Sequence, residues 1–197
     1  MKPYLDTHSA GNLLLVVLLA WLSMEAIQLV RQWRWRAGAT SIGRRSFWLG
    51  FAACLIVTNV ALYLGPSAFP AATIRPGAAA FAAGMVILVA GAVLRGWSFY
   101  SLGRYFTAVI KVSPDQPVIA SGPYRLLRHP SYAGGLLAEV GIAVTSANWA
   151  SVAAFALAWA AIIAWRIQIE ETALLSALGD TYSSYASHHK RLVPLIW

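Results

Sequence analysis

The polar chemistry of this chain is concentrated in residues 122–135, GPYRLLRHPSYAGG. The stretch holds two arginines, a histidine, two tyrosines and three glycines, in a chain of 197 residues that is otherwise rich in Ala, Leu, Val and Ile. Guanidinium and imidazole groups bind anions, and glycine lets a backbone approach a neighbour closely. A second polar stretch, EETALLSALGDTYSSY at 170–185, adds two adjacent carboxylates, Glu170 and Glu171. These two stretches hold the groups best suited to bind a charged molecule.

The composition predicts a membrane protein. Hydrophobic residues make up 59% of the chain and charged residues 11%, against roughly 25% charged residues in soluble domains. The mean hydropathy is +0.62. A net charge of +8 would suggest nucleic-acid binding in a soluble protein, but basic residues in the loops of a membrane protein account for it. We therefore expect a membrane and no nucleic acid as partner.

Apolar runs of about 20 residues can cross a bilayer as helices, and they predict an all-α integral membrane bundle of five transmembrane helices. The expected spans cover residues 11–30, 47–64, 77–94, 132–147 and 149–165, and the third continues past Arg95 toward Tyr100. Asn148 alone separates the last two, which predicts a tight hairpin. We expect a single domain over 1–197, with the first two spans and their loop in 1–76 and the functional portion in 77–197.

The distribution of Lys and Arg predicts the orientation. Thirteen of the 15 basic residues follow the first, third and fifth spans, whereas Lys2 and Arg75 fall on the other side. Cytoplasmic loops are enriched in Lys and Arg. We therefore expect the N-terminus outside, and the C-terminus and both polar stretches in the cytoplasm, in an inner membrane as in a prokaryote.

Local signals assign the polar stretches to structural elements. Pro130 fits the first turn of a helix, where its missing N–H costs nothing, and His129 before it is kept out of the helical region. Residues 109–112 indicate a short extended piece. Gly179 predicts the end of the helix that continues from the last span. Arg166 and Glu170 are four residues apart, a spacing that favours a surface ion pair.

The ordered set of motifs resembles a known family. LGRYFT at 102–107 is followed by GPYRLLRHPSYAGG, an Asn-Trp turn at 148–149, EETALL and LGDTYSSY in the tail, and RLVP at 191–194. This order is similar to that of the isoprenylcysteine carboxyl methyltransferase family, to which the phospholipid N-methyltransferases are related. The similarity covers roughly residues 91–194 and does not extend to the first two spans.

The resemblance implies an integral membrane enzyme that binds S-adenosylmethionine in a cytoplasm-facing pocket without a Rossmann domain. The implied cofactor-binding residues are Tyr124, Arg128, His129, Pro130, Tyr132, Gly134, Gly135, Glu170, Glu171 and Tyr185. The expected catalytic residues are Arg128, Glu171 and Arg191, with Arg125 as an alternative to Arg191 for positioning the acceptor. No metal is expected.

Simpler roles remain open for several of these residues. The arginines also suit positive-inside anchoring, the glycines helix packing, and Tyr182 and Tyr185 anchoring at the interface. The adjacent histidines in the tail lack further ligands for a metal site. Glu25 and Glu139 are ionisable groups within predicted spans, and such groups face a cavity or the bundle interior. For Glu139 we expect a place at the lipid entrance.

These features together predict a methyltransferase that acts on a lipid-like or prenylated acceptor entering from the bilayer, with a carboxyl group as the methyl acceptor. A phospholipid or amine N-methyltransferase and a non-enzymatic membrane scaffold are the alternatives. The sequence does not specify the oligomeric state.

Overall fold

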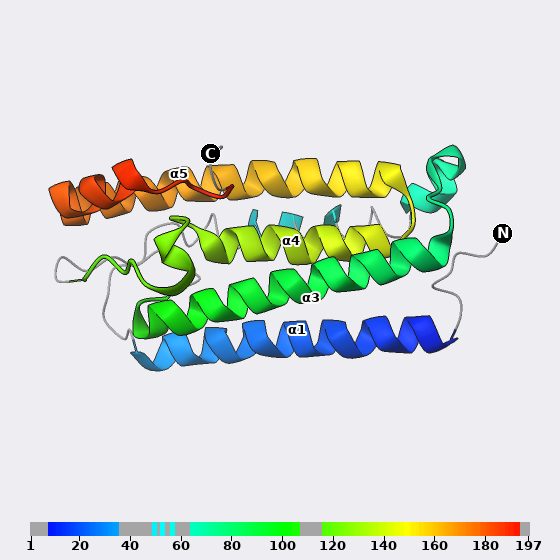
Figure 1. The fold of residues 1–197 in the computed structure, drawn as a ribbon, viewed down its shortest axis with the longest axis horizontal. Helices are drawn as coiled ribbons and strands as arrows, with labels where there is room; N and C mark the ends of the chain where they lie inside the picture. Colours follow the sequence, from blue (N-terminus) through cyan, green and yellow to red (C-terminus); the bar gives the residue numbers. More distant parts are fainter. Residues whose placement is uncertain are drawn as a thin grey trace.

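The computed structural model describes residues 8–35, 49–50, 52–53, 56–57, 64–106 and 116–193. Its main elements are the long helices α1 (His8–Trp35), α3 (Gly77–Leu102), α4 (Pro130–Thr145) and α5 (Trp149–His188), and the short 3-10 turns η2 (Pro70–Ala72), η3 (Gly103–Tyr105) and η4 (Gly122–Arg125). The long helices lie along one axis, in the lateral order α1, α3, α4, α5 (Figure 1). Strand-like pairing in the described residues is limited to two isolated bridges.

The outer faces of the bundle are apolar. Large hydrophobic side chains are exposed along the long helices, among them Leu15, Val16, Val86, Val93 and Leu157. Three of the described helices contain segments long and apolar enough to cross a bilayer: Ser9–Arg31, Gly77–Tyr105 and Trp149–His188. Outward apolar faces on such helices suit contact with lipid. The chain is therefore a helical integral membrane protein.

Four helices lie where the sequence predicted the first, third, fourth and fifth spans, and α1 and α5 are longer than predicted. α3 continues past Arg95 to Leu102, close to the continuation toward Tyr100 that the sequence predicted. α5 continues to His188. The predicted second span at 47–64 lies largely outside the described residues, and the predicted extended piece at 109–112 lies wholly outside them.

Glycines allow α3 and α4 to pack backbone against backbone. A Cβ atom on Gly84 would lie 2.7 Å from the carbonyl oxygen of Gly141, and one on Gly134 would lie 2.6 Å from the backbone nitrogen of Arg95. Gly91 belongs to the same contact. Small residues let membrane helices approach this closely. We call Gly84, Gly91, Gly134 and Gly141 the glycine seam. The seam holds the N-terminus of α4 beside Arg95.

The turn between α4 and α5, residues 146–148, is held by the segment that precedes α3. The Asn148 side-chain oxygen accepts a hydrogen bond from Ser151 N at 3.1 Å and so caps α5. The Asn148 amide nitrogen donates to Phe69 O at 2.9 Å. α4 and α5 consequently run antiparallel from a fixed turn.

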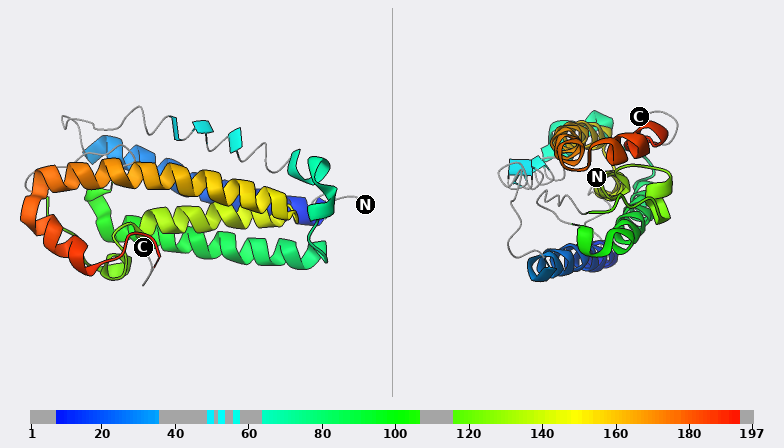
Figure 2. Two further views of the ribbon diagram at one scale, coloured as in Figure 1. Left: turned by 90° about the horizontal axis from the view of Figure 1, so that it is seen from above. Right: turned by 90° about the vertical axis from the view of Figure 1, so that its left-hand side faces the viewer.

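At its other end α5 reverses direction at Gly179. This residue has φ 53° and ψ −128°, a left-handed conformation that glycine adopts readily. The sequence predicted that the helix ends here. Helical geometry is interrupted at Gly179, but it resumes and runs to His188. The part after Gly179 turns back toward the start of α4 (Figure 2).

We expect Gly84→Ala to destabilise the protein, because its methyl group would push the α3 and α4 backbones apart. The expected loss is about 1–3 kcal/mol in the free energy of unfolding, the usual cost of overpacking, measured as a lower midpoint of thermal unfolding in detergent. Gly96→Ala on the same helix is the matched control, since its Cβ would meet the flexible Met24 Sδ at 3.2 Å. Equal midpoints for the two variants would contradict a close-packed seam.

Candidate active site

Three basic side chains meet at the carboxylate of Glu171. Arg128 Nη1 lies 2.8 Å from Glu171 Oε1, and His129 Nε2 lies 3.1 Å from the same oxygen. Arg191 donates from Nε and Nη2 to Glu171 Oε2 at 3.0 and 2.9 Å. Glu171 is only 7% exposed. Both carboxylate oxygens are therefore occupied by donors of the chain itself.

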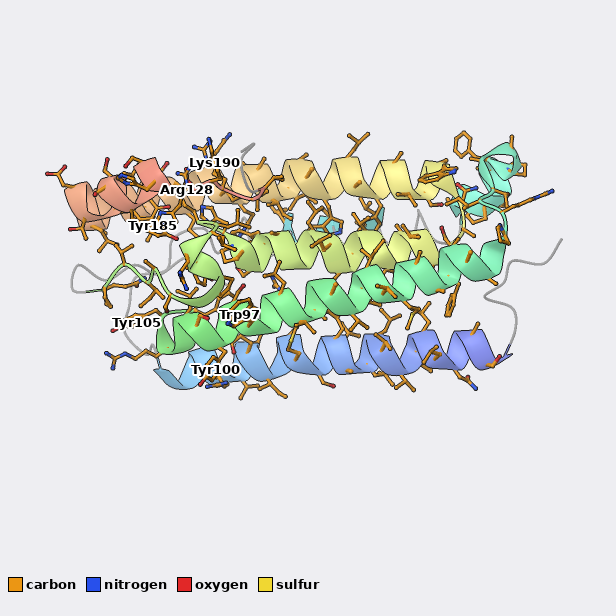
Figure 3. The ribbon with its side chains drawn as sticks, viewed as in Figure 1. Trp97, Tyr100, Tyr105, Arg128, Tyr185 and Lys190 are labelled. Carbon is orange, nitrogen blue, oxygen red and sulfur yellow. The ribbon has the colours of Figure 1, made fainter. Side chains whose placement is uncertain are left out.

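Backbone hydrogen bonds hold these groups in register. Arg128 N donates to Lys190 O at 2.7 Å, and His129 N donates to Arg191 O at 3.0 Å. Pro130 then begins α4 directly after His129, as the sequence predicted. Figure 3 shows Arg128, Tyr185 and Lys190 gathered at this end of the molecule. Two backbone hydrogen bonds thus join the Arg-His-Pro segment to the tail after Gly179.

The basic groups hold Glu171 in its ionised form. A bilayer crossing needs about 20 residues, which places Glu171 beyond the span that begins at Trp149. Burial would raise the pKa of the Glu171 carboxyl, but the hydrogen bonds from His129 and Arg191 and the charge of Arg128 lower it to about 2. The hydrogen bond to Glu171 in turn raises the pKa of Arg191. The network is therefore an ionic one at neutral pH.

Tyr185 ties the tail to η4. Its hydroxyl donates to Tyr124 O at 2.7 Å and lies 3.3 Å from Leu127 O. Its ring stacks on His189, with ring centroids 4.2 Å apart. Burial raises the pKa of Tyr185 to about 12. The hydroxyl of Tyr185 thus stabilises the contact between the tail and η4.

Tyr132 links α4 to α5. Its hydroxyl donates to Glu170 Oε2 at 2.8 Å and accepts a hydrogen bond from Arg166 Nη2 at 3.5 Å. Arg166 is buried, at 7% exposure. The spacing of Arg166 and Glu170 predicted an exposed ion pair on the surface. The structure instead places both residues in contact with the Tyr132 hydroxyl inside the bundle.

A cavity of about 310 Å³ lies between the helices next to this network. Its polar wall is formed by Tyr124, Arg128, His129, Tyr132, Arg166, Glu170, Tyr182 and Tyr185. Much of the remaining wall is apolar and includes Trp21, Leu22, Leu29, Ile162, Ile163, Leu174 and Leu178. A polar wall beside an apolar one suits a ligand with a polar head and an apolar chain.

The residues that the sequence predicted for the site fall into two groups. The cavity is lined by Tyr124, Arg128, His129, Tyr132, Gly135, Glu170 and Tyr185. The lining does not include Pro130, Gly134, Glu171 or Arg191. Gly134 packs on α3 in the glycine seam. Glu171 contacts Arg128 and His129 on the side that faces away from the cavity. Arg125, the alternative positioning residue, is exposed and does not line the cavity.

Sequence reasoning missed Arg95 as a residue of the cavity wall and left Tyr182 undecided. Arg95 lines the cavity from inside α3. The signal for it was an ionisable residue in an apolar helix, which must face the interior of a bundle. Tyr182 is 4% exposed. No signal in the sequence shows whether Tyr182 is buried inside the protein or anchors the chain at the membrane interface.

Unmet hydrogen-bonding capacity is concentrated at the cavity wall. Within the described part of the chain, three buried side-chain atoms lack a hydrogen-bond partner: Arg128 Nε, Tyr182 Oη and Trp159 Nε1. All three belong to residues that line the cavity. Buried polar groups are normally paired, so their position points to a ligand that supplies the missing partners.

The fold and the cavity define a helical membrane protein with a cavity beside a buried carboxylate and three basic groups. The sequence model of the isoprenylcysteine carboxyl methyltransferase (ICMT) family matches residues 83–176. Curated relatives and a solved structure agree with this match. The family model, the curated relatives and the solved structure support the isoprenylcysteine carboxyl methyltransferase family for this chain, as the resemblance of its motifs indicated.

Two curated relatives and one solved structure illustrate the similarity. The chain is 35% identical over 115 residues to protein-S-isoprenylcysteine O-methyltransferase A of Arabidopsis thaliana, across 57% of this chain and 58% of that one. It is 31% identical over 111 residues to the Schizosaccharomyces pombe enzyme, across 55% and 47%. The structure of a eukaryotic intramembrane Ras methyltransferase aligns with TM-score 0.59 and 26% identity, covering 74% of this chain and 52% of that one. The chain thus spans about half the length of these relatives.

We expect acid to weaken the fold through Glu171. Its folded-state pKa of about 2 lies below the ordinary value of 4.5, so its contribution is complete above pH 4.5 and is lost as pH falls toward 2. The contribution is at most about 3 kcal/mol. Thermal unfolding midpoints between pH 7 and pH 2 should show Glu171→Gln less stable at neutral pH and less sensitive to acid.

Glu170→Gln is the matched control for this experiment, since it leaves Glu171 and its three partners in place. It should keep the acid sensitivity of the unchanged protein. An identical acid dependence in Glu171→Gln and the unchanged protein would show that the network does not stabilise the fold.

Proposed function

We propose that the protein is a membrane methyltransferase that uses S-adenosylmethionine to methylate the carboxyl group of a lipid-like or prenylated acceptor. The observation that carries the proposal is the presence of Arg128, His129 and Glu170 on one wall of a cavity that is otherwise largely apolar. The names of the relatives, protein-S-isoprenylcysteine O-methyltransferases, support the reaction type and the acceptor class.

The residues of the polar wall fit S-adenosylmethionine, a molecule with a carboxylate, an amine, ribose hydroxyls, a flat base and a sulfonium. Arg128, whose Nε lacks a partner, and His129 would bind the carboxylate. Glu170 would accept hydrogen bonds from the amine or the ribose. Tyr182 would use its unpartnered hydroxyl, and the rings of Tyr124 and Tyr185 would flank the base or face the cation.

S-adenosylmethionine would supply an electrophilic methyl group, and its transfer from sulfur to a carboxylate oxygen of the acceptor would yield a methyl ester and S-adenosylhomocysteine. A carboxylate is already a nucleophile at neutral pH, so the protein needs no general base for this reaction. The task of the chain is to align the two reactants and keep water away. Glu171 serves as a positioning residue in this scheme, because it fixes Arg128 and His129 without lining the cavity.

The proposal includes the membrane arrangement that the sequence predicted. Five spans would place the site on the cytoplasmic side and the N-terminus outside, with residues 77–197 as the catalytic portion. The concentration of Lys and Arg after the first, third and fifth predicted spans supports this orientation. Within the arrangement, α4 and α5 would form the final hairpin, and the apolar cavity wall would receive the chain of the acceptor from the bilayer.

The test is methyl transfer from labelled S-adenosylmethionine to N-acetyl-S-farnesylcysteine or to a total membrane lipid extract, followed by alkaline treatment. Release of volatile methanol supports a methyl ester. Label that resists alkali would instead assign the acceptor group to an amine or a hydroxyl. No transfer, together with no heat on titration with S-adenosylhomocysteine, would leave a scaffold as the function.

We expect Tyr182→Phe to weaken binding of S-adenosylhomocysteine about three- to tenfold, the effect of one neutral hydrogen bond, measured by calorimetry in detergent. Its unfolding midpoint should not fall, because the hydroxyl has no partner among the described residues. Tyr185→Phe is the contrasting variant, since it loses the bond to Tyr124 O and should lower the midpoint. Unchanged affinity in Tyr182→Phe would remove this hydroxyl from the proposed site.

A further inference from the structure

A second polar cluster lies on the cavity wall, apart from the Glu171 network. It consists of Glu25 from α1, Arg95 from α3 and Glu139 from α4, all of which line the cavity. Arg95 donates from Nε and Nη2 to the two carboxylate oxygens of Glu25, and from Nη1 to Ser131 O at 2.9 Å. The Phe99 ring lies 4.9 Å from the guanidinium carbon. Arg95 and Glu25 are thus a fixed, mutually neutralised pair.

The third member, Glu139, is not paired in this way. Its carboxylate makes no hydrogen bond or ion pair with any residue that the structure describes, although it lies within electrostatic reach of both Arg95 and Glu25. Two carboxylates therefore share one guanidinium. An ionisable group at this position in a membrane helix is costly and is a sign of a functional site. With both carboxylates ionised, the cluster would be one positive charge short of balance.

Trp159 on α5 adds an unpartnered donor at the same depth. Tyr132 on α4 and Arg166 on α5 contact each other. They therefore lie at about the same height along the shared axis of these antiparallel helices. Glu139 and Trp159 each lie seven residues further from that level, which is about 10 Å at 1.5 Å per residue. The cavity wall thus carries an unpaired acceptor and, in the buried Trp159 Nε1, an unpaired donor at one level.

We propose that this part of the cavity binds the head group of the methyl acceptor, and that Glu139 selects acceptors whose head group carries a protonated amine. An ammonium group supplies both the missing positive charge and N–H donors, and its pairing with a carboxylate is strong in a cavity shielded from water. An oxygen of the same head group would accept from Trp159. The term methyl acceptor rests on the proposed function, whereas the preference for an ammonium group does not.

Binding of farnesylamine and farnesol tests the preference without any methyl transfer. The two molecules share one apolar chain and differ in the head group, so a difference in affinity reports on the head group. Titration of the detergent-solubilised full chain, followed by tryptophan fluorescence, should give about tenfold tighter binding of the amine, the effect of a hydrogen bond to a charged group. Glu139→Gln should abolish that preference while still binding both compounds.

Glu170→Gln is the matched control, because it makes the same chemical change on the polar wall of the same cavity. It should keep the preference for the amine. Glu139→Met, of similar volume, should lose the preference as Glu139→Gln does, and it provides a second variant if one of them unfolds. Equal binding of amine and alcohol by the unchanged protein, or a preference that survives in Glu139→Gln, would overturn the proposal. An equal loss of the preference for the amine in Glu139→Gln and Glu170→Gln would overturn the proposal as well.

A second arm connects the preference to catalysis. S-farnesylcysteine should be methylated faster than its N-acetyl derivative and than the analogue that lacks the nitrogen, and Glu139→Gln should remove the difference. If none of the three compounds is methylated but farnesylamine still binds preferentially, the proposed reaction fails and the ammonium site stands. If all three are methylated equally, the reaction stands and the selectivity of Glu139 is refuted.

Discussion

The arrangement of the site depends on one buried carboxylate, that of Glu171. Arg128 and His129 are neighbours directly before α4, whereas Arg191 lies beyond the end of α5, and Glu171 is the group that all three contact. A buried charge that loses its partner is strongly destabilising, so each member keeps the others in place. The cavity wall therefore owes its geometry to a side chain that does not line it.

The helices around this network explain why it can form. The glycine seam sets α4 against α3, and the reversal of α5 at Gly179 returns the chain to the start of α4. The turn at Asn148 fixes the opposite end of the α4–α5 pair. The cavity thus lies beside helices whose relative positions are determined at both ends.

The sequence predicted the class of fold, the positions of four helices, the place of Pro130 at the start of α4, and the family. It could not predict which of two neighbouring residues faces the cavity. Glu170 lines the cavity while Glu171 lies behind it, and Gly135 lines it while Gly134 packs on α3. Neighbours on a helix point about 100° apart. Their assignment is set by contacts with distant segments, which periodicity alone does not reveal.

The contacts of the Arg95–Glu25 pair extend beyond the segment that the family model matches. Arg95 lies inside the segment 83–176 that the family shares, but its counter-charge comes from α1, which precedes that segment. On the other side, Arg191 completes the Glu171 network from beyond the segment. The polar contacts around the cavity therefore include residues on both sides of the segment that the family model matches. A fragment or chimaera cut at the edges of the homology would separate Arg95 from its paired carboxylate, Glu25, and Glu171 from one of its three basic partners, Arg191.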